Sequence, residues 1–148
     1  MSLVVNKRVN FDYEILETVE AGLQLFGFEV KSVRAGHMQI SASYAIIRGG
    51  EAYLINAQIS SYQPNNELIN YDKERTRKLL LTRKEINYLD GKVKERGLTI
   101  VPLKVYNKDG FIKISLGLAK HKKKVDKRST IKERETKRYI NRFLKNQS

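Results

Sequence analysis

The side chains that could do chemistry in this 148-residue sequence are mostly cationic, and they are distributed unevenly. Residues 119–148 contain twelve Lys and Arg against three acids, a net charge of +9, whereas residues 1–118 carry only +4 of the total of +13. Each phosphate that a cation neutralises releases a condensed counterion, so a basic extension is typical of proteins that follow a nucleic-acid backbone. A flexible solubilising tail is the alternative, because blocks of like charge are often merely disordered.

An anionic membrane is the other class of partner that a strong positive charge permits. Membrane binding would require a pronounced apolar stripe opposite the basic face, and the apolar residues of the tail are sparse and late. The chain has no apolar run near the roughly 20 residues that span a bilayer, and its first residues do not form a signal peptide. Because it also has no Cys, we expect a nucleic-acid-binding protein of the cytoplasm, without disulfides.

Residues that could support catalysis or bind a metal are few. The two histidines, His37 and His121, have no partner that the sequence predicts. Asp12, Glu14 and Glu20 could lie on one face of a strand and bind a metal, but such acids are more often a solvated face. The sequence has no phosphate-binding loop of the P-loop kind. We therefore expect no enzyme activity, no cofactor and no metal.

Three basic groups in residues 1–118 could contact RNA, and three tyrosines lie close to them in the sequence. The basic groups are Lys7 and Arg8; Lys31 and Arg34; and Lys73, Arg75, Arg77 and Lys78 with Arg83 and Lys84. Arg suits phosphate because its planar fork donates two hydrogen bonds at once, and Tyr13, Tyr44 and Tyr62 could stack on exposed bases. This combination indicates nucleic-acid binding without indicating its kind.

The elements that must position these residues are mainly strands in the first half of the chain. Alternating apolar residues predict a strand over residues 10–24, and helical spacing with a stop at Gly36 predicts one or two helical turns over residues 27–34. Gly49-Gly50 predicts a hairpin between residues 43–48 and 51–59. We expect one face of its second strand to carry Tyr53, Ile55, Ala57 and Ile59, and the other face Leu54 and Asn56.

The second half predicts a longer helix and another hairpin. Residues 60–72 have little periodicity and indicate a loop. Thr82 and Glu85 form a capping box, and the helix that they begin should bury Ile86, Leu89 and Val93 and end at Gly97. Residues 98–106 and 111–118 should pair about Asn107-Lys108-Asp109-Gly110, with Ile112, Ile114, Leu116 and Leu118 on one face.

The predicted elements favour a mainly β fold. Small antiparallel domains commonly avoid exposed edges by closing, so we expect a small closed OB-fold-type antiparallel barrel over residues 1–118, with two or three helices. A two-layer α+β sandwich remains the alternative. Residues 119–148 form a basic C-terminal tail, in which a second capping box at Thr130 and Glu133 predicts a helix over residues 131–144. A lone helix of this length is marginal in water, so the tail should become helical only against a partner.

Five motifs in this order resemble the SsrA-binding protein (small protein B) family over nearly the whole chain. They are NKR at 6–8 with DYEI at 12–15, EAGLQLFGFEVKSVRAG at 20–36, RTRKLLL at 75–81, GLAKHKKKVDKR at 117–128 and IKERE at 131–135. The resemblance implies an OB-fold barrel that binds the tRNA-like domain of transfer-messenger RNA (tmRNA) in ribosome rescue. It implies a tail that occupies the decoding centre and the empty mRNA channel of a stalled ribosome. It also suggests a monomer that meets elongation factor Tu through the charged RNA.

Site residues follow from the basic groups and from this resemblance. The expected RNA-binding residues are Lys7, Arg8, Tyr13, Glu20, Lys31, Arg34, Tyr44, Arg75, Arg77, Lys78 and Leu80. The expected ribosome-binding residues of the tail are Lys122, Lys123, Lys124, Asp126, Lys127, Arg128, Lys132, Arg134, Lys137 and Arg138. Glu20 would be a buried or bridging acid that accepts hydrogen bonds from RNA or orients a neighbouring Arg.

The chain departs from the family pattern at three positions. His121 stands where Gly is usual, Val125 where an aromatic residue or His is usual, and Thr82 where Asn or His is common. Two other functions stay open from the residues alone. One is a ribosomal or initiation-type protein that binds ribosomal RNA, and the other is an RNA-modifying enzyme that uses the barrel to hold its substrate.

Overall fold

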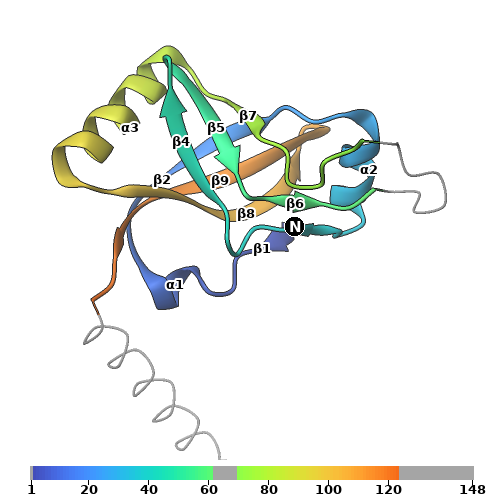
Figure 1. Cartoon of the computed structure of the whole chain (residues 1–148), viewed down its shortest axis with the longest axis horizontal. Coiled ribbons are helices and arrows are strands. Elements are labelled where there is room, and N and C mark those ends of the chain that lie inside the picture. Colours follow the sequence, from blue (N-terminus) through green and yellow to red (C-terminus); the bar gives the residue numbers. More distant parts are fainter. Residues whose placement is uncertain (1, 62–69, 124–148) are drawn as a thin grey trace, which may run out of the picture.

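The computed structural model describes residues 2–61 and 70–123 of the chain, and it confirms a mainly β fold. Figure 1 shows the strands wrapped around a common interior, with α3 at one side and α2 at the other. The elements are β1 (Ser2–Val5), α1 (Val9–Asp12), β2 (Tyr13–Leu23), α2 (Gly27–Arg34), β3 (Met38–Gln39), β4 (Tyr44–Arg48), β5 (Glu51–Ile55), β6 (Gln58–Ile59), β7 (Arg77–Leu80), α3 (Arg83–Arg96), β8 (Thr99–Lys108) and β9 (Phe111–His121).

The strand pairings of the main sheet are antiparallel and run in a ring. The order β8–β4–β5–β7–β2–β9 returns to its start because β9 also pairs with β8, and β1 adds to the other edge of β8. The strand pairing is shortest between β4 and β8, which share the single residue pair Ala45 and Ile100. An open two-layer sheet would not return to its first strand, so the pairings differ from the predicted alternative.

The interior of the ring is apolar, and the β8–β9 hairpin contributes much of it. Ile112, Ile114, Leu116 and Leu118 alternate along β9 and are all buried, as predicted. They pack in one cluster with buried side chains of β5, β7 and β8. Fully burying one such side chain contributes roughly 1.5–3 kcal/mol, so this strand is a main source of stability.

Both predicted hairpin turns are confirmed. Gly49 and Gly50 have φ values of 61° and 75°, and Asp109 and Gly110 have 52° and 81°. Two successive positive φ values give a turn whose twist matches that of the flanking strands. The turns therefore fix the register of β4 with β5 and of β8 with β9.

The predicted division of side chains between the two faces of the second hairpin strand, residues 51–59, is wrong. Asn56 has a φ of 62°, which ends β5 and reverses the alternation of side chains. Ala52 and Leu54 are buried before this residue, and Ala57 and Ile59 after it. Asn tolerates the left-handed region better than most residues, and for this reason the break lies there.

The predicted strand over residues 10–24 is correct only from Tyr13 onward. Its first residues form α1, and a bulge between Ile15 and Glu17 divides β2 into two parts. Val19 packs against the main core, whereas Tyr13 and Ile15 pack against a second small cluster beneath α1. Asp12 therefore does not share a strand face with Glu14 and Glu20.

The predicted helix after the Leu run is confirmed at both ends. The Thr82 hydroxyl accepts a hydrogen bond from the Glu85 amide, and the Glu85 carboxylate accepts one from the Thr82 amide. Gly97 ends α3 in the left-handed conformation, with φ of 64°. Ile86 and Leu89 hold α3 against the core, so the helix closes one end of the ring. No helix among residues 2–61 and 70–123 has the length and apolar character to cross a membrane.

Candidate nucleic-acid interface

A buried carboxylate organises the cations that lead into β7. Glu29 of α2 is completely buried and accepts hydrogen bonds from four residues. Arg77 donates Nε and Nη2 to Glu29 Oε2 at 3.1 and 2.7 Å, and Arg75 donates to both carboxylate oxygens. The Tyr71 hydroxyl and the Phe26 amide complete the set, each at 2.8 Å. Burial alone would raise the pKa of Glu29, but these hydrogen bonds outweigh it and hold the pKa below its usual value.

Arg77, which was predicted to contact RNA, is turned inward in this structure. Its side chain is completely buried, and its remaining N–H groups donate to the carbonyls of Ala57 at 2.6 Å and Lys73 at 3.0 Å. Every nitrogen of the guanidinium has a protein partner. Arg77 instead joins β7 to α2 and to the segment after β5.

Arg75 is the arginine of this network that reaches the surface. Its side chain is 24% exposed, and its guanidinium carbon lies 4.0 Å from the centre of the Phe26 ring. Phe26 is itself 51% exposed, so about half of its side chain faces solvent beside Arg75. Together with Lys78 they border a hollow that is lined by Gln24, Leu25, Phe26, Tyr53, Arg75, Thr76 and Lys78.

A second hollow adjoins the first, because Leu25 lines both. Arg34 and the exposed Leu80 border it, and Arg34 donates from Nη2 to the Gly110 carbonyl at 3.2 Å. Lys113 and the exposed Phe111 come from the facing end of β9. We call the two hollows together the α2–β7 face. This face unites four predicted residues from two separate segments: Arg34 of α2, and Arg75, Lys78 and Leu80 in and just before β7.

Glu20 has the bridging position that was one of its two predicted states, but it is exposed rather than buried. Its carboxylate accepts hydrogen bonds from the Tyr106 hydroxyl and from Lys108 Nζ at 3.2 Å. These bonds, that of Tyr106 above all, lower the pKa of Glu20. Its partners are a tyrosine and a lysine, so the acid that orients arginines is Glu29.

Three further predicted residues meet at the point where β9 ends. Arg8, Tyr13 and Tyr44 line a cavity of about 260 Å³, together with Asn6, Val9, Asp12, Ser41, Ala42, Ser43, Val101 and His121. The Tyr13 and His121 rings have centroids 4.4 Å apart. Burial, followed by the charge of Asp12, raises the pKa of Tyr13. We call this cavity the root pocket, because His121, the last residue of β9, lines it.

Of the remaining predicted residues, Lys122 is half-buried, and the others are exposed, Lys123 among them, or lie outside the described part of the chain. Lys7 and Lys31 are exposed, in the turn before α1 and on α2. The Lys122 amide donates to the Asp12 carbonyl at 3.0 Å, so the start of the tail is attached to α1. The residues outside the described part are Lys124, Asp126, Lys127, Arg128, Lys132, Arg134, Lys137 and Arg138, with Tyr62, Val125 and the predicted helix over 131–144.

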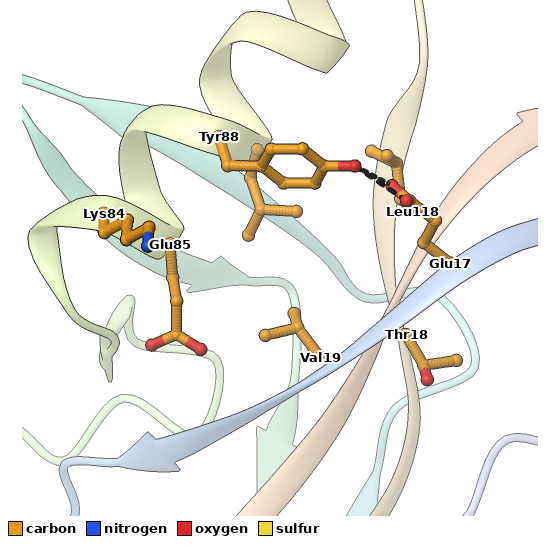
Figure 2. Close-up of a pocket in the computed structure, with 8 residues that line it drawn as sticks. Glu17, Thr18, Val19, Lys84, Glu85, Tyr88 and Leu118 are labelled. Atoms are coloured by element: carbon orange, nitrogen blue, oxygen red, sulfur yellow. Dashed lines mark hydrogen bonds between the residues drawn. The ribbon is translucent and has the colours of Figure 1, made fainter.

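A separate cavity, of about 350 Å³, lies between α3 and the strands β2 and β9 (Figure 2). Figure 2 shows the Tyr88 hydroxyl directed at the Glu17 carboxylate, whose oxygens lie 2.7 and 2.8 Å away. The hydrogen bond to Glu17 raises the pKa of Tyr88. The walls are mainly Val19, Leu89 and Leu118. Within residues 2–61 and 70–123, no three His, Cys, Asp or Glu are grouped so that they could hold a metal ion.

Comparison with known proteins decides the family. A family model described as SmpB protein matches residues 3–146. The chain belongs to the SmpB family. An SsrA-binding protein of Gloeothece citriformis (strain PCC 7424) is 54% identical over 140 residues, which cover 95% of this chain and 90% of that protein. The SsrA-binding protein of Enterococcus faecalis (strain ATCC 700802 / V583) is 52% identical over 141 residues, which cover 95% of this chain and 91% of that protein.

A solved structure agrees with the SmpB assignment. It is described as "tmRNA-SmpB: a journey to the center of the bacterial ribosome", and a chain in it is 50% identical to this one. The match has a TM-score of 0.67 and covers 81% of this chain and 84% of that chain. The resemblance inferred from the five motifs is thereby confirmed.

Sequence reasoning missed Glu29, Phe26 and Asn6 in this SmpB-family chain. Glu29 lies four residues before the buried Val33, so helical spacing already placed both on one face of α2. Phe26 and Asn6 stand inside the family motifs, but neither residue type is basic or a tyrosine. The search for basic groups with nearby tyrosines could not find them, and the family resemblance did not single them out.

Proposed function

We propose that this chain binds the tRNA-like domain of tmRNA and delivers it to stalled ribosomes for trans-translation, the rescue of the ribosome and the tagging of its nascent chain. The observation that carries this function is the match to the solved tmRNA–SmpB structure, at 50% identity over 81% of the chain. The relatives named SsrA-binding protein, which match 95% of the chain, support it independently.

We propose that the ring of six strands acts as a barrel of the OB-fold type. Such barrels present one face and its loops to oligonucleotides. The α2–β7 face fits this use, since it combines Arg34, Arg75 and Lys78 with exposed Phe26 and Leu80. Cations that follow phosphates and apolar rings that stack on bases are how folded RNA with exposed loops is held. Lys31 and Glu20 belong to the same proposed contact, and Arg77 supports it from within.

We assign tmRNA to residues 1–118 and the ribosome to residues 119–148. The first three residues of this second segment still pair with β2 and are structurally part of the body: Ala119, Lys120 and His121. We nevertheless assign them to the tail by function. The net charge of +9 on residues 119–148 supports contact with ribosomal RNA in the decoding centre and the empty mRNA channel. Lys7 and Arg8 lie at the same end as the first tail residues and are assigned to RNA as well.

The protein works in this proposal as a binding module rather than as an enzyme. It acts as a monomer in the cytoplasm, where stalled ribosomes are, and it meets elongation factor Tu through the charged tmRNA. The SmpB family assignment supports a purely RNA-binding role.

The test is to identify the RNA that co-purifies with the tagged full-length chain from cell extract. We expect one dominant species of the tmRNA type, together with ribosomes under low-salt conditions. Recovery of ribosomal RNA without tmRNA would replace the proposal with that of a ribosomal or initiation-type protein. The same purification from cells that lack tmRNA is the control for nonspecific binding by the basic tail.

A further inference from the structure

One buried polar atom in the body has an unmet hydrogen-bonding need. Asn6 is only 6% exposed, and its Nδ2 donates to the Pro102 carbonyl at 2.9 Å. Its backbone amide donates to the Leu103 carbonyl, so the residue is held at both ends against β8. Among the residues that the structure describes, Asn6 Oδ1 is the one buried side-chain oxygen or nitrogen without a hydrogen-bond partner. Buried polar groups nearly always have partners, and an exception requires an explanation.

Asn6 lines the root pocket, and the other walls of that pocket suit a nucleotide. Tyr13 and Tyr44 provide aromatic rings from β2 and β4, and Tyr44 is 37% exposed. The His121 ring, 4.4 Å from that of Tyr13, supports it from β9. Arg8 lies at the rim, and its contact with Asp12 is a long 3.9 Å ion pair that leaves most of the Arg8 side chain exposed.

The size of the root pocket limits what it could hold. Its volume of about 260 Å³ is below the roughly 300–1,000 Å³ of pockets that bind drug-sized ligands. A single base is smaller than such ligands and offers flat faces for stacking as well as N–H donors at its edge. Arg8 at the rim would meet the phosphate outside.

We propose that the root pocket binds one unstacked nucleotide of an RNA partner. In this site the base stacks on the tyrosine rings, an N–H group of the base donates to Asn6 Oδ1, and Arg8 contacts the phosphate. Asn6 thereby selects for a base with a donor at its edge. The inference rests on the proposed RNA-binding function and adds a specific subsite to it, next to the point where the chain enters the tail.

The subsite can be tested on the full chain with mononucleotides. Side-chain amide and aromatic resonances are followed by NMR during titration with the four ribonucleoside 5′-monophosphates and with two analogues that lack base donors. These analogues are purine riboside 5′-monophosphate and 3-methyluridine 5′-monophosphate. We expect at least one natural nucleotide to shift the Asn6 amide and the Tyr13 and Tyr44 rings, with at least tenfold weaker binding by its donor-free counterpart. Equal binding of the analogues, or no shift at the root pocket with any nucleotide, would overturn the proposal.

Two variants extend the test. Asn6→Leu should lose the same tenfold preference, whereas Asn87→Leu makes the same change at an exposed position of α3 and should keep it. The analogue comparison uses the unaltered protein, so it stands even if Asn6→Leu does not fold. Binding of intact tmRNA is measured in parallel. If tmRNA binds while no nucleotide enters the root pocket, the subsite is refuted and the proposed function is retained; if tmRNA does not bind, both are refuted.

Discussion

Replacing Glu29 by Gln should be among the most damaging single substitutions in the body. Glu29 and Arg77 are both completely buried, and the change leaves the Arg77 charge without its counterion. Removing one partner of a buried ion pair costs about 3–5 kcal/mol, because the other charge remains desolvated. Arg75 adds little to this loss, since its side chain is 24% exposed and can regain water. We therefore expect the free energy of unfolding to fall by about 3–5 kcal/mol.

Urea unfolding followed by circular dichroism measures this loss directly. At about 2–4 °C per kcal/mol for a chain of this size, the melting temperature should fall by roughly 6–20 °C. Glu20→Gln is the matched control, because that acid is exposed, and it should leave the unfolding midpoint nearly unchanged. The double variant Glu29→Gln with Arg77→Met should recover much of the loss, since it removes the unpaired charge. A loss below about 1 kcal/mol for Glu29→Gln would refute the reasoning, because a counterion in the core must cost more than a surface contact.

Three other perturbations test separate parts of the structure. Folding lowers the pKa of Glu29, so the contribution of this carboxylate to the free energy of unfolding is complete above its ordinary pKa of 4.5 and is lost as the pH falls below that value. In urea titrations, the free energy of unfolding of Glu29→Gln should therefore fall less steeply than that of wild type as the pH is lowered below 4.5. Burial and the hydrogen bond to Glu29 raise the pKa of Tyr71 to about 12, so the contribution of its neutral hydroxyl to the free energy of unfolding should be present below pH 10 and lost between pH 10 and 12. The difference in free energy of unfolding between wild type and Tyr71→Phe should therefore narrow over that range. A constant difference would contradict this prediction. Arg75→Ala should weaken tmRNA binding by about 1–3 kcal/mol in filter-binding assays, whereas Lys94→Ala on α3 should not; equal effects would mean that the α2–β7 face is not the contact surface.

The parts of the fold that the sequence predicted are those fixed by local interactions. The capping box of Thr82 and Glu85 joins residues three apart, and the two hairpin turns depend on residues that tolerate positive φ. The alternation along β9 is likewise a local pattern with one buried face. Each of these features is readable because its partners are neighbours in the chain.

The features that the sequence did not predict depend on contacts between distant segments or on one backbone angle. Glu29 meets Arg75 and Arg77 across 46 and 48 residues, and no local pattern connects them. Asn56 reverses the faces of its strand through a single positive φ, and the bulge at residues 15–17 does the same in β2. The burial of Arg77 was not predicted for the same reason, because a basic motif does not reveal which of its cations is turned inward.

The most direct test of the division between body and tail is a chain truncated after Lys123, which keeps every described strand and the contact between the His121 and Tyr13 rings. We expect this truncated chain to bind the tRNA-like domain of tmRNA nearly as tightly as the full chain but not to support tagging of nascent chains on stalled ribosomes. Tagging by the truncated chain at the full-length rate, or loss of its tmRNA binding while it remains folded, would contradict the account.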